Sequence, residues 1–336
     1  MNSKKLHQLN NHITFITLVK DNTKYSKLLI NFLKKKKLNF NHIIADGSKF
    51  KQESLFKQIK NKKQKYFYLG EDKSYIDLYK KIYFSINKSK TKYIFFLDQG
   101  DYVNFKTIKK CVDELIRNKE YSCALGEIYN FVQSEKKIYL INKTYKKITS
   151  KNKVIIKRLT NNFHFRSYHG IHNKFILRKS LKIIISEKIN EPRTAEFIID
   201  AINLLNGNVY HINELLYLHN VTKTNPKIHP INSIYKNRQI WYEFFQNYYQ
   251  RRIWLKIKLL YPSKIKKKDF SIIFKKFKFY NSRVFENQED SNKLKYFKNK
   301  IISFIRKNKF FYKLSLILRN SYHINSERLV FLKKII

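Results

Sequence analysis

The chain has 336 residues, of which 43% are hydrophobic and 16% aromatic, so it can build a packed core and is not globally disordered. Six glycines and four prolines are few for this length, which excludes a collagen-like chain and a Pro-rich linker. The formal net charge of +47 favours anionic partners such as nucleic acid or a membrane surface. The alternative explanation for the many lysines is a low-GC genome, since Lys, Asn, Ile, Phe and Tyr are abundant together.

The first 130 residues alternate between predicted strands and predicted helices. The strands cover residues 12–19, 40–45, 66–69 and 93–97, and the helices cover 23–36, a polar stretch after Ser48, the stretch that Ser74 caps, and 104–117. This alternation predicts βαβ units and a largely parallel sheet. Ligands bind at the carboxyl ends of such strands, where Asp46 and Asp98 both stand.

The pattern changes twice further along the chain. Predicted strands cover 121–129, 137–141, 173–178, 209–212 and 215–218, with a helix over 195–206 that ends at Gly207. From about residue 230 the chain is basic and aromatic, with predicted helices over 234–260, 295–306 and 310–320. We therefore expect two regions, 1–225 and 226–336.

The cysteines and the apolar runs bear on the compartment. Cys111 and Cys123 are the only two cysteines, which favours a reducing environment. The N-terminal stretch MNSKKLHQLNNH is not a signal peptide, and no apolar run is long enough to span a bilayer. We expect a cytoplasmic protein, either soluble or peripheral on the inner face of the membrane.

Two acids follow the apolar strand 93–97. Asp98 and Asp101 stand three residues apart, with Gly100 allowing a tight turn between them. Hard cations such as Mg²⁺ take oxygen ligands of this kind together with substrate phosphates. The alternative is a solvated turn, where acids are common.

Two short motifs follow predicted strands: Ala45-Asp46-Gly47-Ser48 comes after the second strand, and Phe96-Leu97-Asp98-Gln99-Gly100-Asp101 comes after the fourth. In this order, they resemble the motifs of the GT-A-fold, family 2-type bacterial glycosyltransferases. The stretch Tyr66–Asp72, Arg158-Leu159 and Tyr168-His169 also look like a subgroup of that family. The resemblance covers residues 12–220 and implies an α/β, GT-A-like fold: a mixed, mainly parallel sheet flanked by helices, here with a helical basic C-terminal extension.

The resemblance also implies how a donor is bound. Asp46 takes the position that contacts the nucleotide base, Asp98 the position that contacts the ribose, and Asp21 lies where it can reach either. Asp101, with Asp98, takes the position that holds a divalent metal, Mn²⁺ or Mg²⁺. Gly100 stands where the family has its middle acid.

The implied catalytic base is Glu196, which precedes Gly207 at the family's spacing, with Ala195 in place of the usual preceding acid. The alternatives are that Glu196 is only a favourable acid near a helix N-terminus, or that Asp200 is the base. Arg166 or His169 is expected to contact the diphosphate or the acceptor. A zinc site formed by His164, His169 and His172 is a weaker alternative.

The function implied is inverting transfer of a sugar from a nucleotide-sugar donor to a hydroxyl of a glycan or lipid-linked acceptor, in cell-surface polysaccharide or glycolipid synthesis. The basic C-terminal region is expected either to contact an anionic membrane surface or to pack on the main domain. Nucleic acid is an unexpected partner, since no RNP, zinc-finger or helix-turn-helix motif is present. A nucleic-acid-binding protein and an inactive sugar-binding relative remain alternatives. A nucleotidyltransferase is a third, although no Gly-rich phosphate loop follows the first strand.

Overall fold

The computed structural model describes residues 9, 11–36, 40–59, 61–133, 138–143, 167–190, 192–220 and 250–261. The chain divides into two compact units, residues 1–265 and residues 266–336. All described residues belong to the first unit, which the following paragraphs concern.

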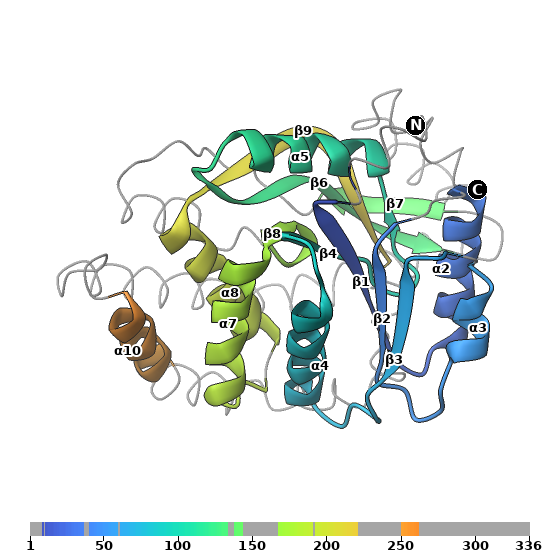
Figure 1. Ribbon diagram of the computed structural model, residues 1–336, viewed down its shortest axis with the longest axis horizontal. Coiled ribbons are helices and arrows are strands. Elements are labelled where there is room, and N and C mark those ends of the chain that lie inside the picture. Colours follow the sequence, from blue (N-terminus) through green and yellow to red (C-terminus); the bar gives the residue numbers. More distant parts are fainter. Residues whose placement is uncertain are drawn as a thin grey trace, which may run out of the picture. The chain divides into compact units, whose positions relative to one another are not determined.

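Among the described residues, nine strands form one sheet in the order β3-β2-β1-β4-β8-β6-β9-β5, with β7 paired to β6 (Figure 1). The strands are β1 (Ile13–Val19), β2 (His42–Asp46), β3 (Gln64–Tyr68), β4 (Tyr93–Phe96), β5 (Tyr102–Val103), β6 (Tyr121–Gln133), β7 (Ile138–Lys143), β8 (Ile171–Asn173) and β9 (Asn208–Asn220). Strands β3, β2, β1 and β4 are mutually parallel, and β6 is parallel to β9. Because β8 runs antiparallel to both β4 and β6, it joins the two parallel groups. The predicted mixed, mainly parallel sheet is confirmed.

Helices cover both sides of this sheet. They are α2 (Thr23–Lys36), α3 (Glu53–Lys57), α4 (Tyr75–Lys88), α5 (Phe105–Arg117), α7 (Lys174–Ser186), α8 (Pro192–Asn206) and α10 (Gln250–Leu260), with a short 3₁₀ turn, η1 (Ser167–His169). In the view of Figure 1, α5 lies at the top beside β6 and β9, whereas α4, α7 and α8 lie side by side lower down. Ser74 caps α4 as predicted, because its side chain accepts a hydrogen bond from the Asp77 amide.

Aromatic rings fill the core beside β1. The Phe15 ring packs edge-on against Phe40, with centroids 4.7 Å apart, and against Phe95 at 5.7 Å. Phe105 at the start of α5 joins this cluster, 5.6 Å from Phe15. All residues of β1, β2 and β4 are buried, as expected for parallel strands covered on both faces. This packing makes the carboxyl ends of these strands a rigid platform.

Two predictions of local structure are wrong. Residues 173–178 were expected to form a strand, but Asn173 ends β8 and caps α7, accepting a hydrogen bond from the Phe175 amide at 2.9 Å. The apolar residues that follow are buried at helical spacing, namely Leu177, Leu181 and Ile184. The two short strands predicted over 209–218 are one long strand, β9, which pairs with β6 along its length despite register shifts.

Helix α10 and Tyr261, the last described residues, contact α7 and α8 within the first unit. Lys256 of α10 pairs with Glu187 at the end of α7, and Tyr261 accepts a hydrogen bond from the Asn206 side chain at 3.1 Å. The predicted boundary near 225 and the predicted helices 295–306 and 310–320 lie outside the described residues. Within the described part of the chain, no helix is both long and apolar enough to cross a membrane. Cys111 and Cys123 are both buried free thiols.

Candidate active site

The turn that follows β4 carries Asp98 and Asp101. The Asp101 amide donates to the Asp98 carbonyl at 3.2 Å, which closes the turn. Asp98 is half-buried at the carboxyl end of the sheet, and its amide donates to the Tyr217 hydroxyl at 3.3 Å. Asp98 thus stands where the sequence predicts it, at the rim where ligands bind in α/β sheets.

Asp101 is fully buried and bound by the end of β9. Its Oδ2 accepts a hydrogen bond from the Tyr217 hydroxyl at 2.7 Å and lies 3.2 Å from the His219 Nδ1. Its Oδ1 accepts from the Asn220 amide at 2.8 Å. Burial, followed by the Asp101 and Asp98 carboxylates, raises the pKa of Tyr217 well above its usual value, so Tyr217 stays a neutral donor. Asp101 therefore ties the turn after β4 to β9.

Gly100 and Gln99 pack this turn against the start of α2. Gly100 has a φ of +74°, and a Cβ there would lie 2.9 Å from the Cδ1 of Tyr25. The Gln99 side chain accepts from the Lys20 amide at 2.8 Å and donates to the Ser26 hydroxyl at 2.6 Å. A side chain at position 100 would therefore require Tyr25 to move.

Asp46, at the end of β2, is also fully buried. Its Oδ1 accepts from the Ser48 amide at 2.8 Å, and its Oδ2 accepts from the Gln52 amide at 2.9 Å and from the Tyr66 hydroxyl. Burial and the adjacent Asp46 raise the pKa of Tyr66. The Asp46 carboxylate thus shapes the loop after β2; its predicted contact with a base stays a prediction.

Asp21 lies at the end of β1, beside the same loop. It is exposed and has a φ of +45°, an uncommon conformation that is concentrated at functional sites when it occurs in residues other than glycine. Its amide donates to the Ser48 hydroxyl at 2.8 Å, and its carboxylate accepts from the Lys49 amide at 2.7 Å. The predicted donor-binding residues Asp21 and Asp46 therefore belong to two loops that hydrogen-bond to each other.

Glu196 lies in the second turn of α8 and is half-buried. The charge of Glu196, like the charges of Asp98 and Asp101, acts on Tyr168 of η1. Burial raises the pKa of Tyr168 well above its usual value, and the charges of Asp98, Glu196 and Asp101 raise it further. The Tyr168 ring stacks on Phe96, the last residue of β4, with centroids 4.9 Å apart. The three predicted acids, far apart in sequence, thus all act on one phenol at the carboxyl end of the sheet.

The turn that carries Tyr168 is tied to α8 by Asp200. The Asp200 carboxylate is buried and accepts from the Ser167 amide at 2.8 Å and from the Ser167 hydroxyl at 2.6 Å. Asn203 donates to the same hydroxyl at 3.1 Å. These bonds give Asp200 an anchoring position, which disfavours the alternative that it is the base.

His169 lies beside the end of β9. Its ring centroid is 4.6 Å from that of Tyr217 and 5.2 Å from that of His219. Arg166 and His164 lie outside the described residues. His172 is fully buried, and burial lowers its pKa to about 4. Where the structure describes the chain, no three His, Cys, Asp or Glu side chains are grouped to hold a metal. The zinc site that would include His164 stays a prediction.

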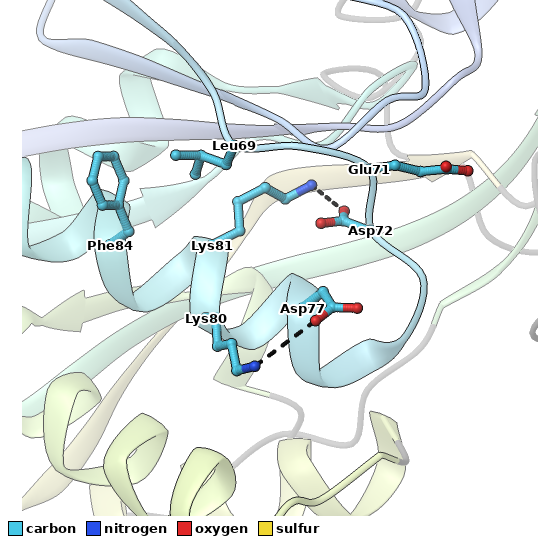
Figure 2. Close-up of a pocket in the computed structure, with 7 residues that line it drawn as sticks. All are labelled: Leu69, Glu71, Asp72, Asp77, Lys80, Lys81 and Phe84. Carbon is cyan, nitrogen blue, oxygen red and sulfur yellow. Dashed lines mark hydrogen bonds and ion pairs between the residues drawn. The ribbon is translucent and has the colours of Figure 1, made fainter.

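A pocket of about 270 Å³ lies where β3 leads into α4 (Figure 2), lined by Leu69, Glu71, Asp72, Asp77, Lys80, Lys81 and Phe84. Lys81 is buried, pairs with Asp72 and donates to the Val19 carbonyl at 3.1 Å. Burial raises the pKa of Asp72 and lowers that of Lys81, and each partner opposes the other's shift. A Cβ at Gly47 would lie 2.2 Å from the Asp72 carboxylate, so this pair fixes the ends of β1, β2 and β3 together.

The residues present do not fit the two-carboxylate metal site that the sequence implies. Both oxygens of Asp101 already accept hydrogen bonds inside the protein, and Gly100 offers no ligand. Only Asp98, of the two predicted ligands, stands at the rim.

Four residues around the site were not predicted from the sequence, namely Tyr25, Lys81, Tyr217 and His219. Tyr217 and His219 are two residues apart on one strand and therefore share a face. The sequence shows this spacing, but no local sequence pattern indicates that this face of the strand contacts Asp101. Lys81 gave no signal, because a lysine in a helix of so basic a chain is expected to be exposed.

No protein-family model matches the sequence, and no curated protein matches it. Its fold is similar to solved structures of S. aureus TarS, a GT-A-like family 2 glycosyltransferase. For TarS 1–349 the TM-score is 0.55 at 16% identity, covering 79% of this chain and 70% of that one. For TarS 1–349 with UDP-GlcNAc the TM-score is 0.52 at 15% identity, covering 78% and 70%, and with UDP it is 0.51 at 14%, covering 78% and 69%. The chain covers 42% of the longer TarS structure. The expected fold is thus confirmed: this chain has the GT-A-like fold of S. aureus TarS.

Proposed function

We propose that this chain is a glycosyltransferase that moves a sugar from a nucleoside diphosphate donor to a hydroxyl group of a glycan or lipid-linked acceptor. One observation carries the proposal: Tyr168 stacks on Phe96 at the carboxyl end of β4, just before Asp98, and its turn is bound by Asp200 to α8, the helix that carries Glu196, in a fold of the glycosyltransferase type. The solved structures of TarS with UDP and with UDP-GlcNAc make a uridine nucleotide the first donor to test.

The proposed reaction is a single inverting displacement. Glu196 accepts the proton of the acceptor hydroxyl as its oxygen forms a bond to the anomeric carbon. The bond between that carbon and the diphosphate breaks on the opposite face, and the nucleoside diphosphate leaves. Asp98 and Asp21 bind the nucleoside, and His169 lies where it can contact the diphosphate or the acceptor. The buried carboxylates of Asp46 and Asp101 hold the loops that present these residues.

The direct test is donor binding followed by turnover. Isothermal titration with UDP, GDP, UDP-GlcNAc and other nucleotide sugars is expected to show a preference for one base, and the preferred sugar is expected to be transferred or slowly hydrolysed. Binding without any turnover would support the inactive sugar-binding relative. Salt-sensitive binding of oligonucleotides with no response to any nucleotide sugar would support the nucleic-acid-binding alternative.

We further propose that the enzyme works on the cytoplasmic face of an anionic membrane, in the synthesis of a surface polysaccharide or glycolipid. Helix α10 supports this, because Leu255, Leu259 and Leu260 are 47%, 76% and 55% exposed beside Lys258. An exposed apolar stretch among basic residues is suited to an anionic interface.

Sedimentation with phosphatidylglycerol vesicles tests this placement. The full chain is expected to pellet with the vesicles, and the Leu255→Ser/Leu259→Ser variant is expected to pellet less. Phosphatidylcholine vesicles are the control and are expected to bind little. Equal binding of both proteins to both vesicles would exclude a role for α10.

A further inference from the structure

The Asp101 carboxylate is bound within the protein. A carboxylate that binds a metal must turn at least one oxygen toward the ion, yet Asp101 is fully buried and both its oxygens accept hydrogen bonds. Tyr217 and His219 approach Oδ2 at 2.7 and 3.2 Å, and the Asn220 amide approaches Oδ1 at 2.8 Å. Turning Asp101 toward a metal would leave buried donors unpaired, which is unfavourable.

The residue before Asp101 is a glycine. Gly100 stands where the resemblance predicts an acid, and its φ of +74° disfavours most side chains. A Cβ would also lie 2.9 to 3.2 Å from three atoms of Tyr25, closer than normal van der Waals contact. The tyrosine of α2 therefore occupies the space that the family's acid needs.

In the ranges that the structure describes, no group of three potential ligands occurs, and of the two predicted metal ligands only Asp98 stands at the rim. Diphosphate charge can instead be met by hydrogen-bond donors and cationic side chains, which a chain of net charge +47 has in excess.

We propose that this chain binds its nucleotide donor without a divalent metal, and that Asp101 is a positioning residue that fastens the turn carrying Asp98 to β9. This inference rests on the proposed function, since it concerns how the same donor is held.

The first experiment measures the Kd of UDP by isothermal titration in excess chelator, and again with Mn²⁺ or Mg²⁺ after chelator removal. The Kd is expected to be the same within about threefold, a difference of about 0.7 kcal/mol. UDP binding that is at least tenfold tighter with metal would overturn the inference and leave the proposed function intact. If neither UDP nor any other nucleotide binds under either condition, the proposed function fails, and the inference fails with it.

The second experiment separates anchoring from metal binding at Asp101. Asp101→Asn is expected to lower the melting temperature equally with and without Mn²⁺, and to leave the ratio of the two UDP affinities unchanged. Tyr217→Phe, which removes one donor to the same carboxylate, is expected to lower the melting temperature in the same way. If Asp101 instead holds a metal, Asp101→Asn would abolish a metal-dependent gain in UDP affinity without lowering the melting temperature.

A third variant asks whether Gly100 and Tyr25 account for metal independence. The double change Gly100→Asp/Tyr25→Ala supplies the acid and the space for it, so Mn²⁺ is expected to tighten UDP binding in this protein. Tyr25→Ala alone is the matched control and is expected to show no metal response. A metal response of equal size in the control would contradict the role assigned to position 100.

Discussion

Glu196 is the residue on which the proposed chemistry depends. We predict that Glu196→Gln, which keeps the size and removes the base, lowers kcat by about 10²- to 10⁴-fold, the usual contribution of a general base. The Kd of the donor is expected to stay unchanged, because a base for the acceptor acts only in the transition state. Steady-state kinetics and titration of the nucleotide measure the two effects separately.

The matched control for Glu196 is Asp113→Asn. Asp113 is an acid on α5, where it pairs with Lys109, and α5 lies on the other side of the sheet in Figure 1. This variant is expected to keep full turnover. A Glu196→Gln protein that turns over as fast as this control would remove Glu196 from the mechanism.

The candidate site residues could be predicted from their places in sequence motifs, but the side chains that contact them could not. Asp98, Asp101 and Glu196 were identified from short patterns at strand and helix ends. That Asp101 is buried under Tyr217 could not be predicted, since the two residues are 116 apart in the chain and no local pattern records which strand lies beside the turn. The burial of Asp101 argues against the metal-binding role that its place in the motif implies.

The turn η1 shows how one element positions another. Its Ser167 amide and hydroxyl both donate hydrogen bonds to Asp200 of α8. Because Glu196 lies on the same helix as Asp200, these bonds fix Tyr168 and His169 of η1 relative to Glu196. We predict that Asp200→Ala leaves the buried Ser167 amide without this acceptor, which costs about 1–3 kcal/mol of stability. We expect turnover to fall as well, because the reacting groups lose their alignment.

Urea unfolding and kinetics on Asp200→Ala measure these two effects. Asn206→Ala, at the far end of α8, removes a hydrogen bond to Tyr261 and is the control: it is expected to affect stability only. Equal turnover in both variants would mean that η1 is not held in place by Asp200.

At the scale of elements, the strands and helices described in the first 117 residues agree with the predictions except for the short strand β5, which was not predicted. The elements that agree are continuous apolar runs or helical repeats between clear turn residues. The error at 173–178 has a physical cause. Phe175, Ile176 and Leu177 are three successive apolar residues, which fit a buried strand as well as a helix. The pairing of β8 with β4 ends at Asn173, so the residues that follow form helix α7 and do not extend the strand.

At the scale of the whole molecule, two histidines buried in the sheet make stability depend on pH. Burial lowers the pKa of His42 of β2 to about 3 and that of His172 of β8 to about 4, from 6.5. Below pH 6.5 the unfolded chain binds protons that the folded chain does not, so the folded state loses stability as the pH falls toward these values. We predict that the free energy of unfolding falls by about 2.7 kcal/mol per pH unit near pH 5, about 1.4 for each histidine.

Urea unfolding at pH 7.5, 6.5, 5.5 and 5.0 gives this slope directly. His172→Asn is expected to reduce the slope by about half, because one of the two groups no longer takes up a proton on unfolding. A free energy of unfolding that is constant over this pH range would contradict the burial of both rings as neutral imidazoles.

The sequence by itself determined the fold class, the parallel strands β1, β2 and β4, and the residues that stand at their carboxyl ends. These features are local, since apolar periodicity and turn residues act over a few positions in the chain. Only the tertiary structure decided that β9 is one strand paired with β6, that Tyr217 and His219 bind Asp101, and that Tyr25 fills the space beside Gly100. Each of these depends on which distant segments pack together, and the side chains that meet there are set by the geometry of the whole sheet.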